Sequence, residues 1–466
     1  MFAKLQRIHF VGIGGIGMSG IAEVLLTLGY GVSGSDLRSS PVTTRLQSLG
    51  AIIFDGHRAE NVTGADVVVC SSAIDPKNPE VAAAHEHHVP VIPRAEMLAE
   101  LMRLKYGIAI AGMHGKTTTT SMVAAVLSAG GLDPTAVIGG RVDSIGSNAR
   151  LGTSQYLVAE ADESDRSFLK LSPILSVVTN IDREHMDCYA DMGDVENTYV
   201  EFMDRVPFYG TVIACNDNDS LREILPRVRR RVVTYGTREG SDFLLSDVEL
   251  DQHAFEVTSR FDVTFKGKKL GPFELHVPGM HNVLNATAAI AVATGLNISP
   301  DKIRGALKQF RGVDRRFQLR GEANGVRVVD DYGHHPTEIR ATLAAARQYA
   351  GTGRVHVIFQ PHRYTRTYLL MDEFGTAFGD ADSIYVLDIY AASEHPIAGV
   401  SGLSLSQKIV GRNGRPGEFA ISFDAAMDAA ASAARPGDII LTLGAGSVSQ
   451  LGPQLVERLK SRISAS

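Results

Sequence analysis

The sequence has few cysteines, and they form no recognisable pattern. Cys70, Cys188 and Cys215 are the three found among 466 residues. They are too few and too irregularly spaced for a disulfide framework or a zinc site, which predicts a reducing environment. No apolar run approaches the ~20 residues needed to cross a bilayer. The net charge of -6 provides no basic footprint for nucleic acid. We therefore expect a cytoplasmic protein with no membrane span and no nucleic-acid partner.

The composition is that of an ordinary globular protein with several domains. Hydrophobic residues make up 44% of the chain and charged residues 21%, which excludes a disordered or fibrous protein. At about 100 to 200 residues per domain, the length predicts two to four domains, and we expect three. The oligomeric state stays open.

Short β-branched runs alternate with helical segments through the first hundred residues. This alternation predicts a parallel sheet with crossover helices. A segment rich in leucine and methionine at 96–105 precedes a new strand, so we place the first domain boundary near residue 105. The second boundary lies at 311–317, because Asn324 and Gly325 then form the turn of a new hairpin.

The predicted fold is therefore α/β with three domains. Residues 1–105 form a Rossmann-like domain, residues 106–314 a central domain like that of P-loop ATPases, and residues 315–466 a second Rossmann-like domain. In the central domain the pattern changes to alternating strands at 241–277. This change predicts a mixed sheet with an antiparallel flap.

A glycine-rich turn, GMHGKTTTT, starts at Gly112 directly after a predicted strand. Its glycines allow backbone N–H groups to converge on phosphate oxygens at a helix N-terminus. In such a loop Lys116 reaches the terminal phosphates, and the Thr117 hydroxyl ligates Mg²⁺. Two residues separate Gly112 from Gly115, fewer than in the common phosphate loop. The preceding strand and the threonine run still favour ATP binding over a chance glycine turn.

Two later strand ends carry oxygen ligands for a metal. Glu160 ends a strand and is placed like the acidic residue that completes Mg²⁺ coordination in P-loop proteins. The segment TNIDREHMD ends another strand with Asn180, Asp182, His185 and Asp187. Because Mg²⁺ prefers oxygen, chemistry alone favours an ordinary loop histidine at position 185.

The first glycine-rich stretch, HFVGIGGIGMSG at 9–20, satisfies the dinucleotide fingerprint with Gly12, Gly14 and Gly17. Asp36 follows about 20 residues on, where an NAD site has a carboxylate for the ribose hydroxyls. Locally, these features favour NAD. However, they recognise only a diphosphate and a ribose, and a UDP-sugar has both. The fingerprint therefore leaves the two ligands open.

Charged side chains gather where the strands of the third domain end. Arginines clamp carboxylates and phosphates and stabilise a transferring phosphoryl group. Open α/β sheets bind ligands at this edge, which favours a ligand site over surface ion pairs. The residues are Arg315, Arg316, Asp330, Asp331, His334, His335, His362, Arg363 and Arg366.

Together these motifs resemble those of the Mur ligase family, the ATP-dependent amide-forming enzymes of bacterial peptidoglycan synthesis. The resemblance covers nearly the whole chain. Its motifs are HFVGIGGIGMSGIAEVL, GMHGKTTT, EADESD, TNIDREHMD, GMHNVLNA, DDYGHHPTE and FQPHRYTRT. Met113 departs from the threonine expected in the phosphate loop. Because the loop binds phosphate mainly through its backbone and Lys116, we expect the methionine to affect the fine tuning of ATP binding rather than the use of ATP itself.

The resemblance implies a ligase that joins the lactyl carboxylate of UDP-N-acetylmuramate to L-alanine in peptidoglycan precursor synthesis. ATP would convert the carboxylate to an acyl phosphate, and the alanine amine would then displace phosphate. The first domain would hold the uridine diphosphate, and the central domain ATP and Mg²⁺. The third domain would close over ATP and the amino acid.

The resemblance also implies roles for individual residues. Those expected to bind ATP are Gly112, His114, Gly115, Lys116, Thr117, Thr118, His281, Asn282, Arg315 and Asp331. Those expected to bind the UDP-sugar or alanine are Gly14, Gly15, Ile16, Gly17, Asp36, His57, Ser72 and Tyr332. The expected metal ligands are Thr117, Glu160 and His185. The expected catalytic residues are Lys116, Asn180, His185, His334, Arg363 and Arg366.

Three alternatives remain at this point. A sister ligase that recycles murein joins a tripeptide to the same UDP-sugar and has similar motifs. An NAD-dependent oxidoreductase would account for the first loop and Asp36, but not for the second loop or Glu160. A nucleotide-dependent binding module or motor would turn over ATP without consuming an acceptor.

Overall fold

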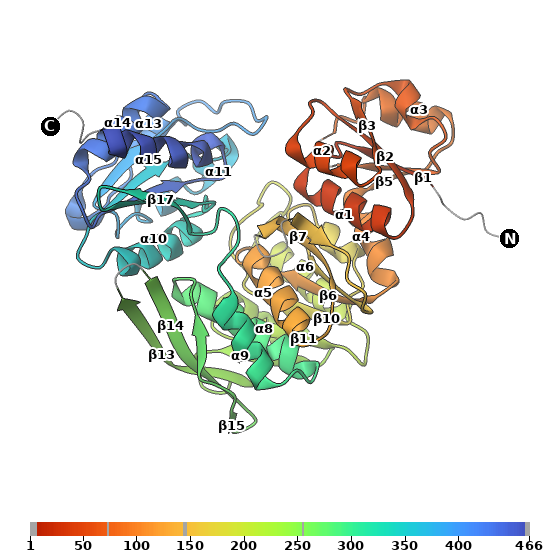
Figure 1. Cartoon of the computed structure of the whole chain (residues 1–466), viewed down its shortest axis with the longest axis horizontal. Helices are drawn as coiled ribbons and strands as arrows, with labels where there is room; N and C mark the ends of the chain where they lie inside the picture. The colour runs from red at the N-terminus through yellow and green to blue at the C-terminus, as the bar shows by residue number, and fades with distance from the viewer. Residues whose placement is uncertain (1–6, 72–73, 143–146, 254–255, 462–466) are drawn as a thin grey trace. The chain divides into compact units, whose positions relative to one another are not determined.

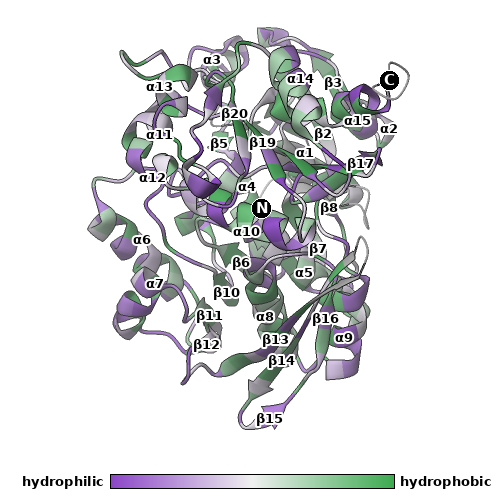
Figure 2. Ribbon diagram, turned by 90° about the vertical axis from the view of Figure 1, so that its left-hand side faces the viewer, coloured by the Kyte–Doolittle hydropathy of each residue, from purple (hydrophilic) through white to green (hydrophobic). Residues whose placement is uncertain are grey.

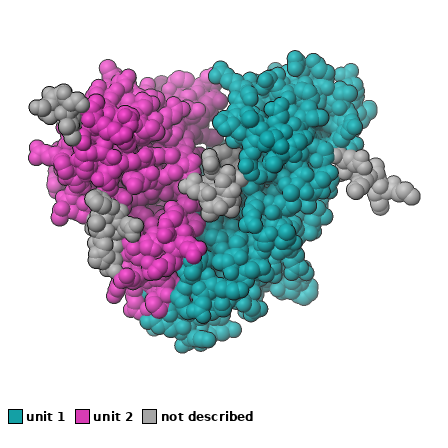
Figure 3. All heavy atoms as spheres, viewed as in Figure 1, with its two compact units in different colours: residues 1–246, 263–271, 284–307 teal, residues 247–262, 272–283, 308–466 magenta. Residues whose placement is uncertain are grey.

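The structure, a computed structural model, describes residues 7–71, 74–142, 147–253 and 256–461. It is an α/β protein built on three sheets (Figure 1). Contacts along the chain divide it into two compact units, which Figure 3 draws in different colours. Unit 1 comprises residues 1–246, 263–271 and 284–307, and unit 2 comprises residues 247–262, 272–283 and 308–466.

The N-terminal sheet has five parallel strands in the order β3-β2-β1-β4-β5. The strands are β1 (Arg7–Val11), β2 (Gly31–Asp36), β3 (Ile52–Asp55), β4 (Val67–Cys70) and β5 (Val91–Pro93). The helices are α1 (Ile16–Thr27), α2 (Pro41–Ser48), α3 (Pro79–Glu86) and α4 (Arg94–Arg103), with a short 3₁₀ turn at Ala59–Val62. The central strands β1 and β4 are buried over most of their length, as expected for a parallel sheet covered on both faces. The predicted Rossmann-like architecture is confirmed.

The second sheet is mixed, with the order β15-β14-β13-β12-β11-β10-β6-β9-β7-β8 and with β16 paired to β14. Its strands are β6 (Tyr106–Ala111), β7 (Thr135–Val142), β8 (Ser147–Arg150), β9 (Tyr156–Glu160), β10 (Leu175–Val178), β11 (Thr211–Cys215), β12 (Val232–Gly236), β13 (Phe243–His253), β14 (Glu256–Phe265), β15 (Lys268–Lys269) and β16 (Phe273–Leu275). The pairs from β9 through β6, β10 and β11 to β12 are parallel, whereas β14 pairs antiparallel with β15 and β16. The predicted antiparallel flap is thereby confirmed. The main helices of this part are α5 (Lys116–Ala129), α6 (Met192–Asp204), α7 (Asp219–Ile224), α8 (Met280–Gly295) and α9 (Pro300–Gln309).

The C-terminal sheet has the order β17-β18-β22-β19-β20-β21. Its strands are β17 (Gln318–Ala323), β18 (Val326–Asp331), β19 (Val355–Phe359), β20 (Ser383–Val386), β21 (Glu418–Phe419) and β22 (Ile439–Leu443). The helices are α10 (Pro336–Ala350), α11 (Tyr364–Leu369), α12 (Met371–Gly375), α13 (Gly402–Ser406), α14 (Phe423–Ala433) and α15 (Leu451–Ser461). One buried cluster lies between the sheet and α10, α12 and α13, and another lies between the sheet and α14 and α15. Figure 2 colours the ribbon by hydropathy, and hydrophobic residues are frequent in the strands of the sheets.

The predicted hairpin turn is present, and its residues have the required backbone. Asn324 and Gly325 both have positive φ, 55° and 71°, as a tight turn between antiparallel strands needs. The sequence patterns did not indicate β3, which is short and partly exposed at a sheet edge. Among the described helices, none combines the length and the apolar character that a membrane span requires. The three cysteines are free thiols.

Candidate active site

The phosphate loop connects β6 to α5 in unit 1. Gly112 has φ 129° and Gly115 has φ 83°, conformations that favour glycine. A Cβ on Gly112 would lie 2.0 Å from Oγ1 of Thr179, and one on Gly115 would lie 2.8 Å from Oδ1 of Asn285. Both positions therefore require glycine, because of their backbone conformation and their close neighbours. The loop leads directly into the N-terminus of α5, where backbone N–H groups can bind an anion.

Asn180 holds this loop from the end of the neighbouring strand β10. Its Oδ1 accepts from the backbone N–H of His114 at 2.9 Å, and its Nδ2 donates to the carbonyl of His114 at 3.0 Å. The backbone N–H of Met113 donates to the carbonyl of Asn180 at 3.3 Å. The side chain predicted to contact phosphate or the substrate carboxylate thus fixes the loop backbone in this structure.

Lys116 is turned back onto its own loop. Its Nζ donates to the carbonyl oxygens of Gly112 at 2.7 Å and Met113 at 3.2 Å, and to Oε1 of Glu163 at 2.7 Å. Burial disfavours the charged ammonium, but the carboxylates of Glu163 and Asp162 outweigh burial and raise the pKa of Lys116 above its ordinary value. Lys116 is therefore cationic, as phosphate binding needs.

Glu160 and Thr117 bring a carboxylate and a hydroxyl together at the start of α5. The Thr117 hydroxyl donates to Oε2 of Glu160 at 3.2 Å, and Oε1 of Glu160 accepts from the backbone N–H of Gly139 at 2.6 Å. These are the hard oxygen ligands that Mg²⁺ prefers. Thr118 lies in the next position of the helix and is buried.

Glu163 is a site residue that the sequence reasoning did not assign. Its side chain is 1% exposed, its Oε1 lies 3.6 Å from Nε2 of His185, and its Oε2 has no hydrogen-bond partner among the described residues. His185 has a positive φ of 57°, which is uncommon for a residue other than glycine. A buried carboxylate oxygen without a partner is costly, and together with the nearby imidazole it forms a donor set that fits a divalent cation. The signal that could have found Glu163 is the acidic segment EADESD.

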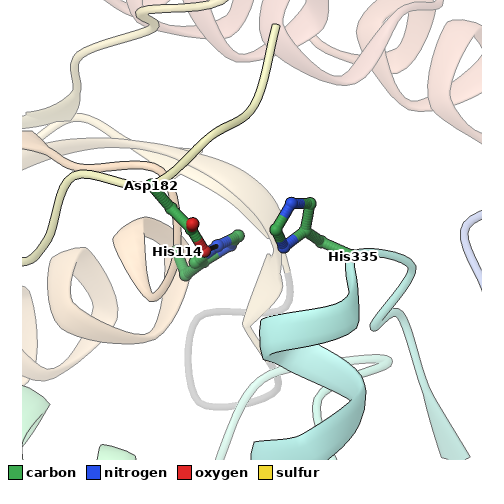
Figure 4. A group of neighbouring side chains, drawn as sticks. All are labelled: His114, Asp182 and His335. Carbon is green, nitrogen blue, oxygen red and sulfur yellow. Dashed lines mark hydrogen bonds and ion pairs between the residues drawn. The ribbon is translucent and has the colours of Figure 1, made fainter. Parts of the chain in front are cut away.

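His114, the loop residue predicted to bind ATP, is paired with an acid. Its Nε2 lies 2.9 Å from Oδ2 of Asp182, and its Nδ1 lies 3.8 Å from Oε2 of Glu184. Figure 4 shows the His114 ring beside the Asp182 carboxylate. The backbone of His114, held by Asn180, remains part of the phosphate loop.

The first glycine loop, between β1 and α1, is held by residues at the end of β2. The carbonyl of Ser35 accepts from the N–H groups of Gly12 and Ile13, and Oδ2 of Asp36 accepts from the N–H of Gly14 at 2.8 Å. Helix α1 starts at Ile16, and its N-cap residue Gly15 has no side chain to bond the first N–H groups of the helix. This N-terminus can accept a diphosphate. In this structure Asp36, predicted to contact the substrate, bonds the loop itself.

Other residues predicted for the UDP-sugar lie in different surroundings. A Cβ on Gly17 would lie 2.9 Å from Nη1 of Arg94, so this glycine allows close packing of α1 against α4. His57 follows β3, and its Nδ1 lies 3.1 Å from Oε2 of Glu80. Ser72 lies outside the described residues.

In unit 2, Asp331 ends β18 and is buried. Its carboxylate accepts from the backbone N–H groups of Phe317 at 2.7 Å and Gly333 at 2.8 Å, and from the Thr342 hydroxyl at 3.0 Å. Burial raises the pKa of Asp331 above its ordinary value, although Arg316 works against this. The residue predicted to meet the nucleotide therefore also organises the segment around β18.

An aromatic group surrounds Tyr332 and His334 at the same sheet edge. The guanidinium of Arg315 lies 4.8 Å from the centre of the Tyr332 ring. The ring of His334 lies 5.3 Å from that of Tyr332 and 5.7 Å from that of His362. His362 in turn stacks on Tyr390, a residue that sequence reasoning missed. The structure thus brings together residues from three strand ends.

Two predicted arginines frame this aromatic group. Arg366 donates to the carbonyl of His362 at 3.1 Å, and Arg363, with φ 72°, donates its backbone N–H to the carbonyl of Tyr390. Burial, with His334 and the arginines, lowers the pKa of His362 to about 3. A neutral His362 leaves the positive charge of the group on the arginines, which suits a carboxylate or phosphate.

The remaining predicted residues of unit 2 are at helix starts. Burial and the charge of Arg316 lower the pKa of His281 to about 4, and Nδ2 of Asn282 donates to the carbonyl of Pro278 at 2.7 Å. His335 caps α10, where Figure 4 draws it, and its Nδ1 accepts from the N–H of Thr337. His335 is thus occupied in starting a helix.

Three family models match consecutive parts of the chain. They describe the Mur ligase family catalytic domain at residues 7–106, the Mur ligase middle domain at 110–293 and the Mur ligase glutamate ligase domain at 315–446. The chain belongs to the Mur ligase family. Its α/β architecture is the three-domain fold of this family.

Individual Mur ligases are similar over the whole chain. The chain is 71% identical to the UDP-N-acetylmuramate–L-alanine ligase of Koribacter versatilis over 99% of both chains. It is 64% identical to the enzyme of the same name from Acidobacterium capsulatum over 100% of both. The solved UDP-N-acetylmuramate-alanine ligase of Thermotoga maritima matches with a TM-score of 0.79 at 29% identity, covering 98% of this chain and 99% of that chain. A murein peptide ligase from Psychrobacter arcticus matches with a TM-score of 0.69 at 25% identity, with the same coverage.

Proposed function

We propose that this Mur ligase joins the lactyl carboxylate of UDP-N-acetylmuramate to L-alanine, with ATP converted to ADP and phosphate. The observation that carries the proposal is the identity of 54 to 71% to eight relatives of that name, each over 98% or more of this chain. The Lys116, Thr117 and Glu160 arrangement supports it, because a carboxylate must be activated before it forms an amide, and transfer of a phosphoryl group from ATP is one way to activate it.

The phosphate loop is the proposed ATP site. Backbone N–H groups at the start of α5 bind the phosphates, and Lys116 neutralises charge on the transferring γ-phosphoryl. Thr117 and Glu160 would hold one Mg²⁺, and His185 with Glu163 would hold a second. When bound, Mg²⁺ polarises the phosphoryl oxygens and favours transfer.

The remaining residues bind and orient the two acceptors. The N-terminal glycine loop takes the uridine diphosphate, and the arginines 363 and 366 attract the carboxylates of alanine and muramate. The carboxylate attacks the γ-phosphorus and forms an acyl phosphate, and the alanine amine then attacks the acyl carbon and expels phosphate. His334 is the proposed group that takes the amine proton. We propose domains at 1–105, 106–314 and 315–466, the last closing over ATP and alanine to exclude water from the acyl phosphate.

Two alternatives are distinguished by the comparisons and by an assay. Membership of the Mur ligase family excludes an NAD-dependent oxidoreductase. The murein-recycling ligase is less favoured, because two solved murein peptide ligases match with TM-scores of 0.69 and 0.60, against 0.79 for the solved alanine ligase.

The test measures ADP release with UDP-N-acetylmuramate and each of alanine, serine, glycine and the murein tripeptide. We expect turnover with alanine and an amide product that mass spectrometry identifies. Turnover that requires the tripeptide and does not occur with free alanine would show that the protein is a murein-recycling ligase. ATP turnover with no amide product would contradict ligase activity altogether.

A further inference from the structure

The N-terminal Rossmann-like domain contains a fully buried carboxylate that the proposed mechanism does not use. Glu80 lies in the first turn of α3 and is 0% exposed. Among the described residues, its ion-pair partners are His9 and His57, and no lysine or arginine side chain pairs with it. A buried carboxylate without a permanent cation needs several hydrogen bonds to remain ionised.

Glu80 obtains these hydrogen bonds from the ends of neighbouring elements. Its Oε1 accepts from Nδ2 of Asn61 at 2.5 Å, and its Oε2 accepts from the Ser35 hydroxyl at 2.5 Å. Its Oε2 also lies 3.1 Å from Nδ1 of His57. Although burial favours the neutral acid, the nearby imidazole of His9 and the hydrogen bonds from Ser35 and Asn61 outweigh it and lower the pKa of Glu80 to about 2. Glu80 is therefore an anion at neutral pH.

The hydrogen-bond arrangement determines which nitrogen of His57 carries hydrogen. The Ser35 hydroxyl has one hydrogen, which it donates to Glu80. Nδ1 of His57 lies 2.9 Å from that hydroxyl oxygen and 3.1 Å from the Glu80 carboxylate. Since both neighbours can only accept, Nδ1 carries the hydrogen. In the neutral ring, Nε2 is then a bare acceptor.

His57 is placed to use that acceptor at the ligand-binding edge of the sheet. It follows β3, whose last residue, Asp55, lies opposite Asp36 at the end of β2. The His57 side chain is 12% exposed, and its Nε2 has no partner among the described residues. The same Ser35 that contacts His57 holds the first glycine loop through its carbonyl. A single buried network thus joins the glycine loop, β2 and His57.

We propose that Glu80 is a positioning residue for the nucleoside of the UDP-sugar: it keeps hydrogen on Nδ1 of His57 and so presents Nε2 to an N–H or O–H donor of the nucleoside. The proposal rests on the proposed function, because it takes the first glycine loop as the site of uridine diphosphate. Uracil offers an imide N–H, whereas cytosine has a bare ring nitrogen at that position, and both nucleosides offer ribose hydroxyls. An acceptor at Nε2 therefore favours uracil where it faces the base, and favours neither where it faces the ribose.

The first test reads the His57 ring in the wild-type protein, and it needs a variant only to assign the signal. Nitrogen NMR of the full-length protein labelled in histidine, with His57 assigned by its absence in His57→Gln, reports which ring nitrogen carries hydrogen. We expect the Nδ1–H form in the wild type. An Nε2–H form would overturn the proposal, even if variants at position 80 fail to fold.

The second test measures binding of UDP and of CDP by titration calorimetry. We expect Glu80→Gln to weaken UDP binding about tenfold, with a mixed His57 tautomer and with ATP affinity unchanged. The matched control is Glu86→Gln, the same change at an exposed position of the same helix, which should bind UDP like the wild type. A larger loss for UDP than for CDP assigns the donor to the base, and an equal loss assigns it to the ribose.

The outcomes separate this proposal from the proposed function. A wild type that binds no UDP contradicts the proposed substrate. A wild type that binds UDP normally, together with a folded Glu80→Gln variant of equal affinity and unchanged His57 signals, contradicts the role of Glu80 alone.

Discussion

Lys116 and Glu163 form a buried ion pair at the phosphate loop, with Nζ 2.7 Å from Oε1. Two loop carbonyl oxygens, of Gly112 and Met113, accept the other hydrogens of the ammonium. An ammonium has three donors, so a γ-phosphate must replace at least one of these partners. Glu163 then keeps its negative charge in a buried position, which favours a cation beside it.

Removing the ammonium should abolish most of the activity. We expect Lys116→Ala to reduce the rate of ADP formation by about 10² to 10³-fold or more, because charge on the transferring phosphoryl loses its nearest cation. Lys268→Ala, at an exposed position of β15, is the control and should be unaffected. A Lys116→Ala enzyme with near-normal turnover would show that this loop is not the ATP site.

Neutralising Glu163 should change the requirement for metal. We expect Glu163→Gln to raise the Mg²⁺ concentration for half-maximal activity about tenfold, because the amide is a weaker ligand beside His185. Electron paramagnetic resonance of Mn²⁺ bound in the presence of ATP should report fewer tightly held ions. The control Glu239→Gln changes an exposed carboxylate. An unaltered dependence of activity on Mg²⁺ would mean that Glu163 binds no metal and only pairs with Lys116.

Gly112 of the phosphate loop and Gly305 of helix α9 should respond differently to replacement by alanine. Gly112→Ala places a Cβ 2.0 Å from Thr179 in a backbone with φ 129°, so we expect loss of ATP binding and destabilisation of more than about 1 kcal/mol. Gly305→Ala in α9 meets no atom within 4 Å and should stabilise the protein by roughly 0.5 to 1 kcal/mol. Urea unfolding and ATP titration of both variants provide the measurement. Equal behaviour of the two would contradict the loop geometry.

The sequence predicted what depends on neighbouring residues and missed what depends on strand order. Lys116 and Thr117 could be recognised because a phosphate loop is a short local motif. The acidic segment EADESD marks Glu163 as one of several carboxylates but does not give its role, which follows from its contact with Lys116, 47 positions away. Asn180 was predicted to face ligand, yet its amide bonds the His114 backbone because β10 lies beside β6.

Strand pairing between distant parts of the chain also explains why the sequence did not indicate the role of Glu80. It lies in the first turn of an alanine-rich helix, where an acidic residue usually serves only the helix dipole. Its contacts with Ser35 and His57 arise from the order β3-β2-β1-β4-β5, which one unaligned sequence does not encode in any local pattern. The α/β fold class, in contrast, follows from hydrophobic periodicity alone.

Asp331 should prove to be as important for folding as for function. We expect Asp331→Asn to lower the free energy of unfolding by about 1 to 3 kcal/mol, because the amide can accept fewer of the hydrogen bonds from Phe317, Gly333 and Thr342. The exposed control Asp372→Asn should have little effect. Thermal unfolding followed by circular dichroism measures both. A variant of wild-type stability that lacks ATP binding would instead make Asp331 a nucleotide contact alone.

Two partly buried histidines of unit 2, His281 and His362, should make stability depend on pH in a defined direction. The pKa values of His281 and His362 are lowered from 6.5 to about 4 and about 3, in both cases chiefly by burial. Between pH 6.5 and 4 the unfolded chain therefore binds more protons than the folded chain. Their contribution is present above pH 6.5 and is lost as the pH falls toward 4, by an amount on the order of a few kcal/mol. Asp331 acts in the opposite direction, because its pKa is raised.

Urea unfolding at pH 7.5, 6 and 5 tests this dependence. Carboxyl groups with lowered pKa, such as Asp382, lose their contribution only below the ordinary aspartate pKa of about 4, so above pH 5 they do not add to the decline that the histidines cause. His362→Gln should flatten the decline between pH 7.5 and 5, whereas His395→Gln, at an exposed position, should leave it unchanged. A decline of equal size in His362→Gln and in the wild type would mean that the folded protein does not hold this imidazole in its neutral form.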